Sequence, residues 1–131
     1  MDYCEIYNGA VQLLNGDQTL PDVADYERRA GYLLANFTML AAPVDTVYRE
    51  INSLPALTQR SYSYVELNKF FPLSTIFAPA AIYYLAAMLV LDENETLSDK
   101  LFDLYVNEIA TIQASFPAKS TKTADRYGLL T

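Results

Sequence analysis

Residues 70–91 contain no charged side chain, and this stretch of 22 residues limits the possible folds more than any other feature. A helix needs roughly 20 apolar residues to cross a bilayer, so a membrane span is the first alternative. Pro72 and Pro79 leave about 15 residues, Phe77 to Leu91, for an unbroken helix of roughly 22 Å, which is shorter than a hydrocarbon core of about 30 Å. The flanks also lack the basic cluster that orients a span. We therefore expect no membrane contact and a helix buried at the centre of a protein core.

Apolar residues recur at helical spacing on both sides of this stretch. The pattern predicts four further helices, at residues 3–14, 21–43, 44–51 and 96–116. Pro43 is expected to end the second of them, because a proline inside a helix removes a backbone hydrogen bond. Thr96 and Asp99 match the spacing of a capping box at the start of the last helix. The short turn before it predicts that this helix packs antiparallel to the central one.

Residues 53–69 are the least regular part of the chain, since Pro55 and several serines and threonines interrupt the periodicity. Residues 61–67 alternate weakly in the manner of an edge strand. We expect a mainly α fold, a small bundle of about five helices around the buried hydrophobic helix. It would form one domain over residues 1–116, with 53–69 as a loop that can reach a neighbouring subunit, and would be followed by an extended C-terminal tail over 117–131.

The tail differs in charge from the helix before it. Residues 118–131 hold three basic residues and one acid, whereas residues 92–108 hold six acids and a single lysine. This contrast predicts that the tail docks on an acidic surface, its own or a neighbour's; a frayed terminus is the alternative. The candidate subunit contacts are the basic and apolar residues of the tail: Lys119, Lys122, Arg126, Tyr127, Leu129 and Leu130.

Charge and cysteine content exclude several classes of protein. A net charge of −7 argues against a generic nucleic-acid binder, which needs a basic face to neutralise phosphates. It is compatible with a wall past which DNA slides, because an acidic surface repels phosphates. The first ten residues carry acids where a signal peptide needs basic residues, so we do not expect secretion. Cys4 is the single cysteine and is expected to be a buried or half-buried small residue.

The residues that usually carry catalysis are missing from the sequence. There is no histidine, which removes the commonest general base and the commonest metal ligand. The four glycines are too far apart to form a phosphate-binding loop. Residues 92–103 have the ligand spacing of a calcium loop, but Leu97 stands where that loop needs glycine and Asp103 where it needs glutamate. We expect no enzymatic activity, no metal and no cofactor.

Five short motifs follow one another along the chain. They are LLNG at 13–16, Tyr26-x-x-Arg29-Ala30, Phe71-Pro72-Leu73 followed by YYLAA at 83–87, LDEN at 91–94 with Tyr105 beyond it, and Tyr127-Gly128. In this order the chain resembles the small head–tail connector proteins, also called head-completion or neck proteins, of tailed bacteriophages and prophages. The resemblance covers most of the chain, but residues 53–69 match nothing in it, which leaves the connector subtype open.

The resemblance implies a structural role without catalytic residues. Such proteins are helical bundles that assemble as homo-oligomeric rings between the portal and tail proteins, and DNA passes through the ring without sequence-specific binding. It also implies that the protein is part of the virion and is assembled in the cytoplasm of the bacterial host. The alternative is a cytoplasmic helical adaptor or regulator that binds a protein partner through a tyrosine-rich surface, because tyrosine accounts for 11 residues of the chain and is common at protein contacts.

Overall fold

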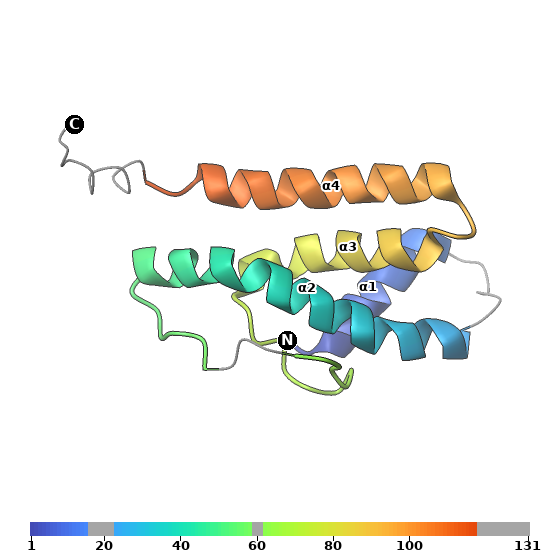
Figure 1. Cartoon of the computed structure of the whole chain (residues 1–131), viewed down its shortest axis with the longest axis horizontal. Coiled ribbons are helices and arrows are strands. Elements are labelled where there is room, and N and C mark those ends of the chain that lie inside the picture. The colour runs from blue at the N-terminus through green and yellow to red at the C-terminus, as the bar shows by residue number, and fades with distance from the viewer. Residues whose placement is uncertain (16–22, 59–61, 118–131) are drawn as a thin grey trace.

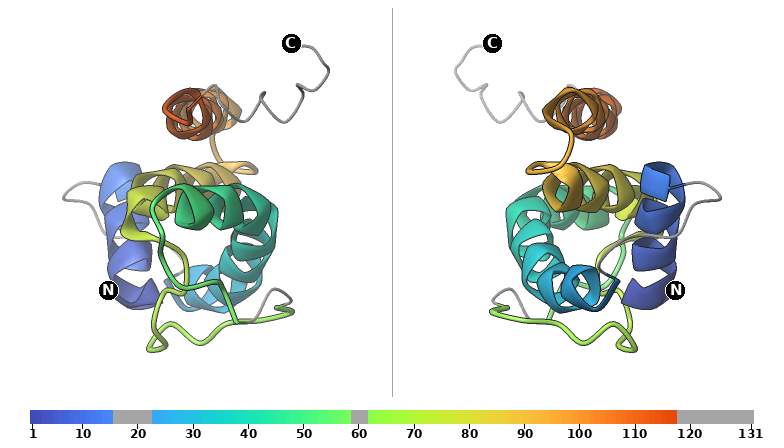
Figure 2. Two further views of the ribbon diagram at one scale, coloured as in Figure 1. Left: turned by 90° about the vertical axis from the view of Figure 1, so that its left-hand side faces the viewer. Right: turned by 90° about the vertical axis from the view of Figure 1, so that its right-hand side faces the viewer.

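The computed structural model describes residues 1–15, 23–58 and 62–117 and is mainly helical, as expected. Its elements are α1 (Tyr3–Asn15), α2 (Val23–Ile51), the 3-10 turn η1 (Thr75–Phe77), α3 (Ala78–Val90) and α4 (Glu95–Ala114). Figure 1 shows α3 in the middle, with α4 along one side of it and α1 and α2 along the other. Seen end-on in Figure 2, α4 forms an outer layer of its own above α3. Residues of all four helices contribute to one hydrophobic cluster.

The central helix of this cluster is α3, which confirms the interpretation of the charge-free stretch. Nine of its 13 residues are buried. Ala80, Ala81, Ala86 and Ala87 have no exposed surface, and their small side chains allow neighbouring helices to come close. Among the described residues, no helix is both long enough and apolar enough to cross a membrane.

The prediction that Pro43 ends the second helix was wrong, because α2 continues through it to Ile51. Proline removes the hydrogen bond to the carbonyl four residues earlier, at Met39, whose side chain lies on the exposed side of the helix. Ala42 before the proline and Asp45 after it are both buried. We infer that packing of both halves of the helix against the core outweighs the lost bond. The described part of the chain therefore has four α-helices, close to the expected number of about five.

The start of α4 also differs from the prediction. Asn94 caps the helix, and its side chain accepts a hydrogen bond of 3.0 Å from the backbone N–H of Leu97. Asparagine is as good a cap as threonine, and the observed cap lies two residues before the expected one at Thr96. The antiparallel arrangement of α3 and α4 is confirmed (Figure 1). The Ser98 hydroxyl fastens the two helices by donating a hydrogen bond of 2.8 Å to the Ala87 carbonyl.

The loop between α2 and α3 packs on its own chain. The backbone N–H of Val65 donates to the Gly31 carbonyl over 3.1 Å, and that of Tyr3 donates to the Lys69 carbonyl over 3.0 Å. Within the described residues the only β-type pairing is an isolated bridge between Asp2 and Phe70. The edge strand predicted over 61–67 is therefore wrong for residues 62–67, the part of it that the structure describes. Contact of this loop with a neighbouring subunit stays a prediction.

Candidate functional site: the exposed face of α4

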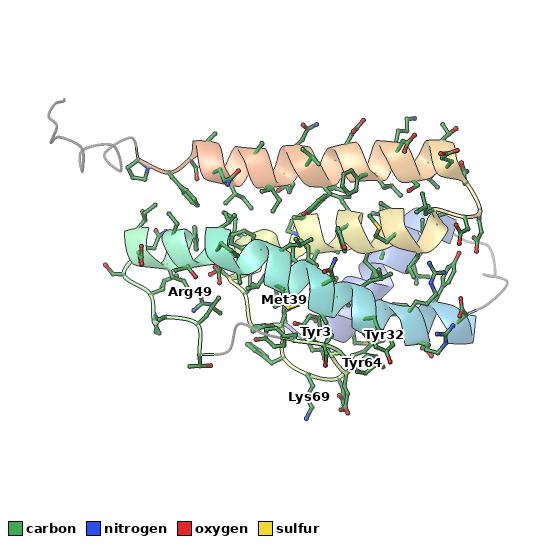
Figure 3. All side chains as sticks on the ribbon, viewed as in Figure 1. Tyr3, Tyr32, Met39, Arg49, Tyr64 and Lys69 are labelled. Atoms are coloured by element: carbon green, nitrogen blue, oxygen red, sulfur yellow. The ribbon has the colours of Figure 1, made fainter. Side chains whose placement is uncertain are left out.

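Asp45 and Arg49 of α2 form an ion pair with a structural role. Asp45 is fully buried, and its carboxylate accepts a hydrogen bond of 2.7 Å from Nε of Arg49. The two terminal nitrogens of Arg49 donate to the carbonyls of Pro55 and Pro72 over 2.8 and 2.9 Å. Arg49, which is labelled in Figure 3, thus ties both ends of the loop to α2. Each of its three nitrogens donates one hydrogen bond within the protein, which makes the pair a clamp for the loop.

A hollow of about 540 Å³ lies beneath the loop, and its lining includes the aromatic residues Tyr3, Tyr62 and Phe70. Thr38 donates its hydroxyl proton to the Leu34 carbonyl over 2.7 Å, so Tyr3 must donate in its own 2.8 Å bond to Thr38. Burial raises the pKa of Tyr3 to about 12. The phenol of Tyr3 is therefore neutral and donates a buried hydrogen bond. It stabilises the core and is a poor nucleophile.

The outer helix α4 buries only one of its sides. Leu101 and Ile112 are buried on that side, and Tyr105 packs edge-on against Tyr84 of α3 with ring centroids 5.1 Å apart. The neighbouring side carries a second apolar row made of Phe102, Val106 and Ile109, which we call the α4 seam. Spacings of four and three residues place these side chains on one face, as in the seam of a coiled coil.

The α4 seam faces solvent in this structure. Phe102 is 38% exposed and Val106 is 47% exposed, whereas Ile109 is half-buried. A shallow hollow of about 200 Å³ lies along the C-terminal half of the seam and is bordered by Ala110 and Gln113. Among the described residues, no other helix lies above α4 in either view of Figure 2. Large apolar residues grouped in this way are typical of an interaction surface.

Acidic residues continue the same row toward the start of α4. Glu95 and Asp99 precede Phe102 by seven and three residues, so they share its face, and both are exposed. Asp103 lies beside the row. Residues 92–108 hold six acidic residues and one basic residue, Lys100. From here on the α4 seam includes these two acids, so it has an acidic half, Glu95 and Asp99, and an apolar half, Phe102, Val106 and Ile109. Such a surface fits a partner segment that carries basic residues at one end and apolar residues at the other.

The candidate subunit contacts in the tail, Lys119 to Leu130, all lie outside the described residues, so their docking stays a prediction. Sequence reasoning missed the α4 seam, although a signal for it was present. Helical spacing groups Leu104 with the buried Leu101, but Leu104 is 44% exposed. The helix has more large apolar residues than one face can hold, and the spacing from Phe102 to Ile109 marks the second row. In the described part of the chain no group of three or more cysteine and acidic side chains is placed to hold a metal ion.

Comparison with known proteins finds no protein-family model, no curated protein and no solved structure that matches this chain.

Proposed function

We propose that the chain is a structural subunit of a head–tail connector, which assembles as a ring between the portal and the tail of a tailed phage and lets DNA pass. The observation that carries the proposal is the exposed α4 seam. A helix that buries one side on α3 and offers a second apolar row to solvent is suited to packing against another subunit. A heterologous contact of this kind repeats from copy to copy and closes into a ring.

The positions of the quoted motifs give further support, because two that are distant in sequence contact each other. Tyr26 donates a hydrogen bond of 2.5 Å to the carboxylate of Glu93, which belongs to the LDEN turn. Arg29 donates to the carbonyl of Met88 near the end of α3 over 3.1 Å. The Tyr-x-x-Arg motif thus braces the turn from α3 to α4. Two of the motifs that carry the resemblance therefore support the turn from which α4 starts.

The charge of the chain is compatible with a channel for DNA. The net charge is −7, and the described surface gathers acids at the start of α4. An acidic wall repels phosphates, so DNA would slide past such a subunit without sequence-specific binding.

Disruption of the gene in the phage or prophage that carries it tests the proposal. We expect particles whose heads contain DNA but lack attached tails, seen by electron microscopy, and we expect the protein in purified wild-type virions by mass spectrometry. Rescue by Leu104→Asp but not by Val106→Asp would link the phenotype to the α4 seam, since both residues are exposed on the same helix. Normal infectious particles without the gene would refute the proposal.

The alternative role, an adaptor that binds a protein partner, rests on a different surface. Tyr32 and Tyr64 are 58% and 45% exposed, and their rings meet edge-on with centroids 4.7 Å apart (Figure 3). Against this alternative, Tyr3, Tyr7, Tyr26 and Tyr84 are buried, so much of the tyrosine content belongs to the core. Absence of the protein from virions would favour the adaptor.

A further inference from the structure

The α4 seam sets requirements on whatever covers it. Its acidic half, at Glu95 and Asp99, comes first along α4, and its apolar half, at Val106 and Ile109, follows. From Glu95 to Ile109 the row is about 21 Å long at 1.5 Å per residue. A matching segment must therefore present basic residues to the start of α4 and apolar residues to its second half.

Residues 118–131 of this chain have this order of side chains. Their basic residues come first, at 119, 122 and 126, and the apolar Tyr127, Leu129 and Leu130 come last. The segment carries three basic residues and one acid, against six acids and one lysine over 92–108. Fourteen residues span up to about 46 Å when extended, which is more than the roughly 30 Å of α4.

Direction decides between the tail of the same subunit and that of another. A subunit's own tail has to start from the C-terminal end of α4, and its first basic residue, Lys119, follows Ala114 by only five positions. That tail would therefore bring its basic residues to the apolar half of the seam first. If the tail folded back, Leu129 and Leu130 would come to the acidic half, which reverses the match. A tail that arrives from another subunit can enter at the acidic start of α4, and then both halves match.

We propose that the α4 seam is the docking site for residues 118–131 of a second copy of this chain. The inference rests on the proposed assembly of the chain into a ring and specifies the contact that links one copy to the next. Each subunit would donate its tail to one neighbour and receive a tail from the other, which is a heterologous arrangement.

Site-directed disulfide trapping in the full chain tests this contact. In a Cys4→Ser background, one variant carries Val106→Cys and a second, with a different mass tag, carries Leu129→Cys. The two are mixed in a glutathione buffer, and the mixed disulfide is measured by mass spectrometry. The matched control replaces the first variant with Leu104→Cys, because Leu104 lies on the other flank of α4 and is 44% exposed against 47% for Val106. Circular dichroism checks that each variant keeps its helices.

We expect the Val106 pair to exceed the Leu104 pair by roughly tenfold, which corresponds to about 1.4 kcal/mol of positional preference. Raising the salt to 1 M should lower that excess, because the Debye length falls to about 3 Å and weakens the pairing of basic tail and acidic helix. Equal yields from the two pairs would overturn the proposal. Exclusive intramolecular closure of a Val106→Cys/Leu129→Cys chain at any dilution would also overturn it, in favour of the subunit's own tail.

The two proposals fail separately. Absence of the mixed disulfide together with tailless heads after gene disruption would reject this docking site and leave the connector role standing. A specific disulfide together with normal particles after gene disruption would reject the connector role and leave the contact between copies standing.

Discussion

Replacement of Arg49 by methionine should destabilise the protein strongly, although the residue looks like an ordinary helical surface arginine in the sequence. The change keeps much of the apolar side-chain stem and removes the cation that faces Asp45, which has no exposed surface. Breaking a buried ion pair from one side costs about 3–5 kcal/mol, because the other charge stays buried without a partner. The carbonyls of Pro55 and Pro72 lose a donor as well. Since Arg49 is itself 17% exposed, we expect a loss of about 3 kcal/mol.

Urea unfolding followed by circular dichroism measures this loss, and a double-mutant cycle isolates its cause. In the variant Asp45→Asn/Arg49→Met no buried charge remains, and the asparagine oxygen can still accept from the backbone N–H of Ser74. We expect the double variant to be more stable than Arg49→Met alone by about 1–2 kcal/mol. Hydrogen exchange should rise in the loop that the arginine holds. A loss below about 1 kcal/mol for Arg49→Met, or a double variant less stable than the single one, would refute the clamp.

Three further changes test the packing of the chain. Gly31→Ala should destabilise by about 1–3 kcal/mol although alanine favours a helix, because its Cβ would lie 2.2 Å from the ring of Tyr64, and an unchanged urea midpoint would contradict this. Asn94→Ala should cost about 1 kcal/mol and Thr96→Ala almost nothing, which separates the observed cap from the expected one by thermal unfolding. Burial raises the pKa of Tyr3 to about 12, above the roughly 10 of an unfolded phenol, so its stabilisation is complete below pH 10 and is lost between pH 10 and 12. Tyr3→Phe should flatten that decline in urea titrations at high pH, and an unchanged slope would exclude Tyr3 as its source.

The central helix was predictable from sequence because its signal does not depend on distant partners. A helix that is apolar all round has to be surrounded by protein, whatever the order of the other elements. The local rule failed at Pro43 for the opposite reason. The cost of a proline in a helix is local, but the burial of Ala42 and Asp45 on either side depends on elements far away in the sequence.

The loop depends on tertiary contacts that no spacing reveals, and so does the exposure of the α4 seam. Asp45 and Arg49 stand four residues apart, as countless solvated helical pairs do. What distinguishes this pair is the loop, whose Pro55, Pro72 and Ser74 hydrogen-bond to it. From the sequence, Gly31 would be expected only to weaken a helix. In the structure it lets the loop backbone approach α2, where Val65 hydrogen-bonds to its carbonyl. The α4 seam could have been found as a second row at coiled-coil spacing, but its exposure follows from α4 lying alone in its layer (Figure 2).

Sedimentation velocity of the wild-type protein and two point variants tests assembly through the α4 seam most directly. Val106→Asp adds a charge to the seam, whereas Leu104→Asp adds the same charge to an equally exposed position on the other flank. We expect the wild type and Leu104→Asp to form larger species as concentration rises, alone or with portal protein, and Val106→Asp to remain monomeric. A wild type that is monomeric under every condition, or a Val106→Asp variant that assembles like the wild type, would contradict the account.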